Sequence, residues 1–233
     1  MAGLTQNRKF VLRFPPHRQA ASRFLKPKNK MNSEQKDFFA EKAKDYDKDK
    51  LRVDNVTNIS NLILKEVKYQ KDFNIMDFGS GTGLLLSKIA PYVGKITAID
   101  ISKSMNEILK NKVHTIECLV DIIEVDLSTE DLNQKFDGII SSMTMHHVED
   151  VVKLFGKFYE LLDENGTIAL SDLDEEDGTF HTEDTGVFHH GFNRDEFLNI
   201  AKSAGFKNLK IQTVGLVEKP YGKYPVFLLT GNK

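Results

Sequence analysis

Residues 74–83 read Asn-Ile-Met-Asp-Phe-Gly-Ser-Gly-Thr-Gly, and three leucines follow them. A short apolar run ends at the acidic residue Asp77, after which Gly79, Gly81 and Gly83 stand at alternate positions. The leucines open a helical pattern. Strand, glycine turn and helix in this order are typical of a nucleotide-binding crossover, in which the turn is tight and a ligand approaches the backbone closely.

The glycine spacing departs from the dinucleotide fingerprint G-x-G-x-x-G, because Leu84 stands where the third glycine of that fingerprint would fall. The carboxylate of Asp77 also argues against a dinucleotide, since it would repel a pyrophosphate and attract a cationic ligand. S-adenosylmethionine (SAM) carries an ammonium and a sulfonium and has no phosphate. The charge at the mouth of this strand therefore favours SAM over a nicotinamide dinucleotide.

Two further acidic residues end the next apolar runs. Asp100 follows residues 95–99 and lies 17 residues after Gly83, near the distance expected of a carboxylate that binds both ribose hydroxyls. Asp126, with Leu127 beside it, follows a third run. In this order the three points resemble the class I SAM-dependent methyltransferases, and the resemblance extends from about residue 36 to the C-terminus.

The resemblance implies a role in cofactor binding for each of these positions. The glycine motif would hold the methionine part of SAM, the second acidic site the ribose, and the third site would flank the adenine. Residue by residue, these roles fall on Asp77, Gly79, Gly81 and Gly83, on Asp100 with Ile101, and on Asp126 with Leu127.

Alternating strand-like and helix-like segments predict an α/β fold, a Rossmann-like three-layer sandwich with helices on both faces of a mostly parallel sheet. The resemblance implies seven strands, one of them antiparallel within a terminal hairpin. We expect Glu164-Asn165-Gly166 to end a helix with a glycine turn, either Ser102 or Ser104 to cap a second helix, and Asn193 to cap a third. The expected strands lie near residues 74–78, 96–99, 122–125, 136–141, 167–173, 206–213 and 226–230.

An N-terminal helical cap is expected before the first strand. One helix begins at Ser33 and ends near Tyr46, and a second spans about residues 53–67. The resemblance implies that such helices cover the cofactor and close the substrate pocket. Phe39, Tyr46 and Arg52 are therefore candidate pocket residues, with plain packing as the alternative for Phe39.

Ligands of such sheets bind beyond the carboxyl ends of the strands, so residues after the fourth strand should face the reacting group. His146 and His147 stand there. Neighbouring histidines at a loop-to-helix junction are expected to point in different directions, one as a general base and the other packed. A purely structural histidine, bonded to the backbone at the helix start, is the open alternative.

The stretch from residue 171 to 194 is rich in carboxylates, histidines and phenylalanines and too irregular for one element. A loop of this length and composition predicts a lid over the pocket. With Tyr46, we assign substrate binding to His189 and Arg194, although Arg194 could simply pair with the acidic loop. No metal is predicted, because the alternative ligand set lacks a fixed helical spacing; that set is Asp172, Asp174, His181 and His189.

Composition favours a cytoplasmic protein that acts on a small molecule. No apolar run approaches the roughly 20 residues of a membrane span, and the single cysteine, Cys118, fits a reducing compartment. Residues 1–30 hold eight of the 32 Lys and Arg residues and none of the 34 Asp and Glu residues. The remaining acidic body is a poor host for nucleic acid.

We interpret residues 1–30, with three prolines, as a basic disordered extension, and residues 31–233 as the catalytic domain. Upstream sequence before a start at Met31, a transit peptide and an RNA-binding arm stay open for the extension. The predicted activity is SAM-dependent methyl transfer to a small molecule, with acceptor and oligomeric state undetermined. The alternatives are a tRNA or protein methyltransferase, a non-catalytic SAM-binding protein, and a dehydrogenase, against which Asp77 and Leu84 weigh.

Overall fold

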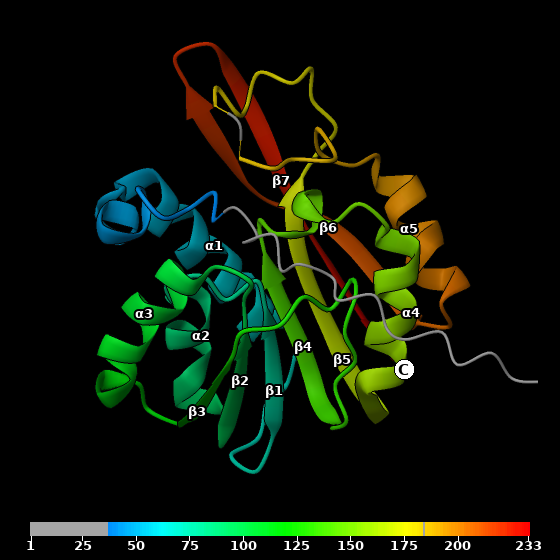
Figure 1. Ribbon diagram of the computed structural model, residues 1–233. Helices are drawn as coiled ribbons and strands as arrows, with labels where there is room; N and C mark the ends of the chain where they lie inside the picture. The colour runs from blue at the N-terminus through cyan, green and yellow to red at the C-terminus, as the bar shows by residue number, and fades with distance from the viewer. Residues whose placement is uncertain (1–36, 184) are drawn as a thin grey trace, which may run out of the picture. The chain divides into compact units, whose positions relative to one another are not determined.

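The computed structural model describes residues 37–183 and 185–233 of the chain. This part forms a seven-stranded sheet in the order β3-β2-β1-β4-β5-β7-β6 (Figure 1). β7 runs antiparallel to both of its neighbours, and the other pairs are parallel. The predicted Rossmann-like α/β fold is therefore confirmed. The strands are β1 (Asn74–Phe78), β2 (Lys95–Ile99), β3 (Leu119–Ile123), β4 (Phe136–Ser142), β5 (Leu162–Leu173), β6 (Lys207–Lys219) and β7 (Gly222–Asn232).

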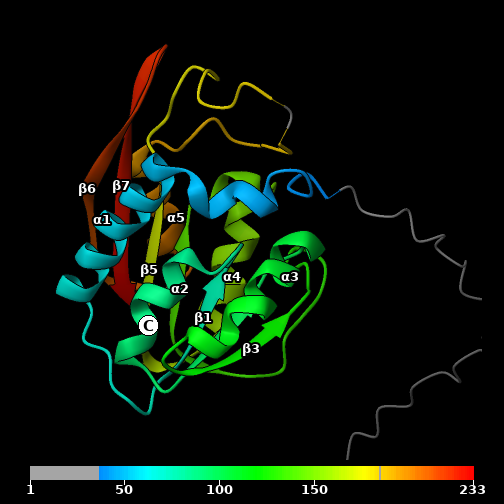
Figure 2. The ribbon, with the colours of Figure 1, turned by 90° about the vertical axis from the view of Figure 1, so that its left-hand side faces the viewer.

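Helices cover both faces of the sheet, as Figures 1 and 2 show. Alternate residues of β1 divide between two apolar cores, with Ile75 on the side of α1 and α2 and Met76 on the side of α4 and α5. The helices are α1 (Lys50–Glu66), α2 (Leu84–Ile89), α3 (Lys103–Lys112), α4 (Val151–Leu161) and α5 (Arg194–Ser203), and the short 3-10 turns are η1 (Ala43–Lys48), η2 (Ala90–Tyr92), η3 (Val113–Thr115) and η4 (Met145–His147).

Side-chain caps fix where the longer helices begin. Ser102 accepts a hydrogen bond from the Met105 amide, and Asn193 accepts from the amides of Asp195 and Glu196. Each bond satisfies a backbone donor that the first helical turn leaves unpaired. Both predicted caps are confirmed, and they place the loops that precede α3 and α5.

The predicted first helix differs from the structure. Ser33 lies outside the described residues, and the chain from residue 37 forms turns and the 3-10 segment η1 instead of an α-helix. Its carboxylates bind other parts of the fold, because Asp47 accepts hydrogen bonds from Thr82 and Lys112. Tertiary contacts therefore replace the regular helix. The predicted extension, residues 1–30, also lies outside the described residues.

Several element boundaries also differ from the predicted ones: β5 begins at Leu162 instead of near residue 167, β6 extends to Lys219, and β7 begins at Gly222. β3 covers residues 119–123 instead of 122–125, because its register against β2 pairs Leu119 with Lys95, whereas the apolar run itself carries no boundary signal. The helix before β5 ends at Leu161, and Asn165 rather than Gly166 takes the positive φ of 67°. Asparagine tolerates the left-handed region better than most residues do. In the described part of the chain, no helix combines the length and apolar character that a bilayer crossing requires.

Candidate active site

The glycine loop between β1 and α2 is tied to the next strand. The amides of Gly79 and Ser80 both donate to the carbonyl of Ile99, at 2.8 and 3.0 Å. Gly79, Gly81 and Gly83 have φ values of 68°, 53° and 85°, which lie in the left-handed region that favours glycine. The loop therefore keeps a tight turn at the carboxyl end of the sheet.

The three glycines differ in what surrounds them. A Cβ on Gly79 would lie 2.1 Å from Cγ2 of Thr144, and one on Gly83 would lie 2.6 Å from Cδ1 of Leu109. A Cβ on Gly81 would meet no atom within 4 Å. Packing thus requires Gly79 and Gly83 to be glycine, while Gly81 faces open space from which a ligand can reach the backbone.

Asp77, at the end of β1, is fully buried, and its Oδ2 has no hydrogen-bond partner among the described residues. Burial, and next the negative charge of Asp100, raise the pKa of Asp77 to about 8. An unpaired buried carboxylate oxygen is unfavourable. A cationic group that reached this oxygen would supply the missing partner, and an ammonium has the required charge and donors.

Asp100 holds the glycine loop from the end of β2. Its carboxylate accepts hydrogen bonds from the amides of Gly81 and Ser102, at 2.7 and 2.8 Å. Burial raises the pKa of Asp100 even though these two bonds act in the opposite direction. The side chain therefore fixes the position of Gly81, and its remaining lone pairs are free to accept from a ligand.

The residues expected to contact ribose and adenine lie along the same edge of the sheet. Ile101 is 53% exposed beside Asp100. Asp126 is half-buried and accepts a hydrogen bond from the Ser128 amide at 2.8 Å. The side chain of Leu127 is buried in the core on the α4 side, so only its backbone is available to a ligand. None of these positions lines the pocket described next.

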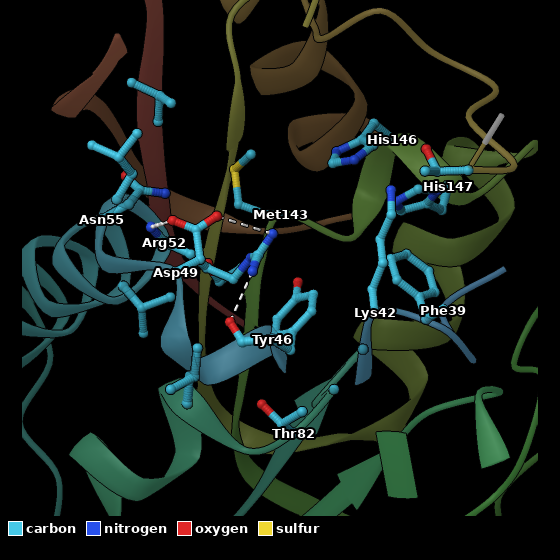
Figure 3. A pocket seen from close by; sticks show the side chains of 18 of the residues that line it. Phe39, Lys42, Tyr46, Asp49, Arg52, Asn55, Thr82, Met143, His146 and His147 are labelled. Atoms are coloured by element: carbon cyan, nitrogen blue, oxygen red, sulfur yellow. Dashed lines mark hydrogen bonds and ion pairs between the residues drawn. The ribbon is translucent and has the colours of Figure 1, made fainter. Parts of the chain in front are cut away.

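A pocket of about 270 Å³ opens beside the glycine loop (Figure 3). The N-terminal segment contributes Phe39, Tyr46 and Arg52, as the sequence predicted. The Arg52 guanidinium lies 3.8 Å from the centroid of the Tyr46 ring and donates to the Tyr46 carbonyl at 2.8 Å. Five segments distant in sequence thus meet here: the stretch from Phe39 to the start of α1, the glycine loop, the turn after β4, the loop after β5, and the end of β6.

The turn after β4 brings a histidine–carboxylate pair to the pocket. Nδ1 of His146 lies 2.6 Å from Oδ1 of Asp172, which stands near the end of β5, and both side chains are buried. The Leu173 amide donates to the same oxygen at 2.7 Å. Because a carboxylate accepts only, His146 carries hydrogen on Nδ1 and leaves Nε2 as the acceptor when the ring is neutral.

His147 does not point away from the site, so the expected division between a facing and a packed histidine is wrong. The two rings lie 4.3 Å apart between centroids, and both line the pocket (Figure 3). The loop after β5 folds over this turn, where the amides of Phe188 and His189 donate to the His146 carbonyl. Phe39 of the N-terminal segment also packs on the His147 ring, at 5.6 Å between centroids, so both segments hold the histidines at the pocket.

His181 completes a histidine cluster, defined here as His146, His147 and His181. Its ring centroid lies 5.1 Å from that of His146. Burial, and next the positive charge of His146, lower the pKa of His147 to about 4. The same causes, with repulsion from His147, lower the pKa of His181 to about 3. Among the described residues no group of three or more His, Cys, Asp or Glu side chains is arranged to hold a metal ion.

The structure places two predicted substrate-binding residues elsewhere. Nε2 of His189 donates to the Val148 carbonyl at 2.9 Å, and Arg194 binds Asp174 through two hydrogen bonds of 2.6 and 2.8 Å. Neither residue lines the pocket. Both donors are already satisfied within the fold, so His189 and Arg194 hold the loop after β5 in place, and the assignment to substrate is corrected.

The sequence did not identify three pocket residues whose side chains can bind a ligand or carry a proton. His181 was considered only as a metal ligand, and Lys42 and Lys219 were not singled out. No local pattern marks them, because Lys219 ends a long strand and Lys42 lies in an irregular turn. Their position depends on how distant segments pack.

Comparison with known proteins shows the family of this chain. A family model described as "Methyltransferase domain" matches residues 18–211. An uncharacterized methyltransferase of Schizosaccharomyces pombe is 30% identical over 186 residues, which cover 71% of this chain and 64% of that protein. Malonyl-[acyl-carrier protein] O-methyltransferase 1 of Ilyobacter polytropus is 36% identical over 104 residues, 44% of this chain and 38% of that protein. The chain thus spans less than two thirds of the length of these relatives.

Solved structures share the fold at low sequence identity. Magnesium protoporphyrin IX methyltransferase from Synechocystis, with bound S-adenosylhomocysteine (SAH), aligns with a TM-score of 0.60 and 16% identity over 78% of this chain and 84% of that one. Phosphoethanolamine N-methyltransferase 2 of Haemonchus contortus, in complex with SAM, aligns with a TM-score of 0.60 and 16% identity over 76% of this chain and 52% of that one.

Proposed function

Because the chain belongs to the class I SAM-dependent methyltransferases, we propose that it methylates a small-molecule acceptor whose reacting atom must lose a proton. His146 is the general base of this proposal. The observation that supports this role is the buried hydrogen bond between His146 and Asp172. His146 lines the same pocket as the glycine loop.

The residues at the carboxyl edge of the sheet fit SAM. The unpartnered Oδ2 of Asp77 suits the ammonium, and the open space beside Gly81 lets a ligand approach the backbone. When bound, SAM supplies a methyl carbon joined to a sulfonium, with a neutral leaving group. In this proposal Asp100 and Ile101 contact the ribose, and Asp126 and the backbone of Leu127 contact the adenine.

Asp172 prepares His146 to accept a proton. Its carboxylate holds the Nδ1 hydrogen and stabilises the imidazolium that forms when Nε2 takes a proton from the acceptor. His147 and His181, with pKa values near 4 and 3, stay neutral and compete poorly for that proton. The cluster therefore directs the proton to His146.

The rest of the pocket aligns the reactants and excludes water. Phe39 and Tyr46 line it from the N-terminal segment, and Phe180 lines it from the loop after β5. Displacement at a methyl carbon needs alignment of the nucleophile, carbon and leaving group more than it needs strong charge stabilisation. The modest volume of the pocket and its enclosure by these segments support a small acceptor rather than a macromolecule.

Calorimetry and a methyl-transfer screen test this proposal. We expect SAM and SAH to bind the purified protein and NAD not to bind. We expect extracts of small metabolites to support formation of SAH from SAM, and His146→Asn to abolish this turnover while retaining SAH binding. Absence of SAM and SAH binding would refute the proposal. Full turnover by His146→Asn would remove His146 as the base.

A further inference from the structure

The pocket is lined by three basic side chains as well as by the carboxylates of Asp49, Asp77 and Glu183. Lys42, Arg52 and Lys219 all line it. Lys42 pairs with Glu183 at 2.7 Å, and Arg52 lies 3.5 Å from Asp49 (Figure 3). Lys42 and Arg52 therefore have carboxylate partners, whereas Lys219 makes no such ion pair among the described residues.

Lys219 has no carboxylate partner within ion-pair distance among the described residues. Its Nζ donates to the Phe180 carbonyl and lies 3.6 Å from the centroid of the Phe180 ring. Burial, and next repulsion from Arg52, lower the pKa of Lys219, while the charges of Asp49 and Glu176 act in the opposite direction and outweigh the smaller effect of Lys42. A half-buried ammonium that makes no ion pair gains from an anion that contacts it.

This cation stands next to the histidine cluster. Phe180, beneath Lys219, is followed by His181, and the charge of Lys219 contributes to the low pKa of His181. The His181 ring in turn lies 5.1 Å from the His146 ring, measured between centroids. The pocket thus holds both the His146 ring and, through Phe180 and His181, the positive charge of Lys219.

We propose that the acceptor carries an anionic group, a carboxylate or a phosphate, that binds Lys219 with support from Arg52 while its protic atom faces His146. The proposal rests on the proposed function and specifies its substrate class. The anion is a recognition group distinct from the methylated atom, because a carboxylate that was itself methylated would need no base. Lys219 is then a specificity-determining residue that touches the acceptor.

Binding of simple aromatic probes to the SAH-saturated full chain tests this inference. Benzoate, phenyl phosphate, benzamide and benzylamine share a ring and differ in charge. We expect benzoate or phenyl phosphate to bind about 10-fold more tightly than benzamide, the scale of one charge-assisted hydrogen bond. Whichever of the two anions binds more tightly identifies the group as carboxylate or phosphate. Calorimetry or ligand-observed NMR gives the affinities.

Two matched variants test whether Lys219 causes the preference for anions. Lys219→Gln should remove the preference for anions and leave SAH affinity unchanged. Lys223→Gln, in the same hairpin but paired with Glu218, should behave as the unmodified protein does. Equal binding of benzamide, tighter binding of benzylamine, or an anion preference that survives Lys219→Gln would overturn the inference while the proposed function stands. Failure of SAH to bind would instead refute the proposed function, and this inference with it.

Discussion

Nδ1 of His146 and Oδ1 of Asp172 lie 2.6 Å apart, and both side chains are buried at the wall of the candidate active site. His146 belongs to the turn after β4, and Asp172 stands near the end of the neighbouring strand, β5. Because the two strands are parallel and adjacent, their carboxyl ends meet at one edge of the sheet. This adjacency orients the His146 ring and fixes the hydrogen on Nδ1, which the sequence did not show.

Asp172→Asn tests that orientation. The amide keeps the size of the side chain but removes the charge that stabilises a protonated His146. We expect turnover to fall by roughly 10²-fold or more, the usual contribution of general base catalysis, with SAH affinity unchanged. Imidazole ¹⁵N shifts should show loss of the Nδ1-protonated form of His146. Asp163→Asn, at the exposed other end of β5, is the control, and an equal loss of turnover there would argue against a specific role.

The raised pKa of Asp77 predicts pH-dependent cofactor binding. With a pKa of about 8, Asp77 is mostly protonated at neutral pH in the free protein, and only its ionised form attracts an ammonium. SAH affinity should therefore rise from pH 6 to pH 8, with release of a proton on binding. Calorimetry in two buffers of different ionisation enthalpy measures that proton. Asp77→Asn should abolish both effects, and their persistence would assign them to another group.

The same shift predicts how stability changes with pH. Between the ordinary pKa of 3.8 and the raised value of about 8, the folded protein holds a proton on Asp77 that the unfolded chain has released. The free energy of unfolding therefore decreases as the pH rises through this window. Urea unfolding at pH 6.5 and 8.5 should show a smaller decrease for Asp77→Asn than for the unmodified protein. Equal decreases would contradict the assignment.

His147 and His181 predict acid sensitivity of the opposite sign. Their pKa values in the folded protein, about 4 and about 3, lie below the ordinary value of 6.5. The unfolded chain therefore binds protons first as the pH falls, and stability that is complete above pH 6.5 is lost toward pH 4. His147→Gln should flatten this decrease. NMR titration of the imidazoles checks the cause directly, since a midpoint near 6.5 for His147 would show that burial does not depress it.

Gly81→Ala should separate ligand binding from folding. The added Cβ meets no atom within 4 Å but sits at a φ of 53°, so we expect a loss of stability of about 1 kcal/mol. The added methyl group should block the approach of SAH to this backbone, so the affinity of the protein for SAH should fall by more than 10-fold. Gly79→Ala, whose Cβ would collide with Thr144, should instead destabilise the fold strongly. Unchanged SAH affinity in Gly81→Ala would show that the ligand does not approach this backbone.

Asp100→Ala tests the carboxylate that the sequence assigns to ribose. We expect SAH binding to weaken by roughly 1–3 kcal/mol, the range for unpaired polar partners. Part of this loss comes from the amides of Gly81 and Ser102, which lose their acceptor. Comparison with Asp121→Ala, on the outer strand β3, controls for general electrostatics. An affinity equal to that of the unmodified protein would exclude Asp100 from the cofactor site.

Much of the fold followed from local patterns. The strand at residues 74–78, the glycine turn and the capped helices could be predicted because alternation, glycine and capping residues act over a few positions. The first and last residues of β3 could not be predicted in this way, because the pairing of β3 with β2 determines them. The N-terminal segment escaped prediction for a similar reason, because Asp47 binds Thr82 and Lys112 instead of supporting a regular helix.

The sequence by itself determined the family and predicted that Asp77 and Asp100 lie beside the glycines at the carboxyl edge of the sheet, because these features lie within or directly after single strands. The tertiary structure decided which residues share the pocket. It joined His146 to Asp172, added His181 and Lys219, and placed His189 and Arg194 outside. Such contacts depend on the packing of distant loops, where each donor binds the acceptor that the folded chain brings near it.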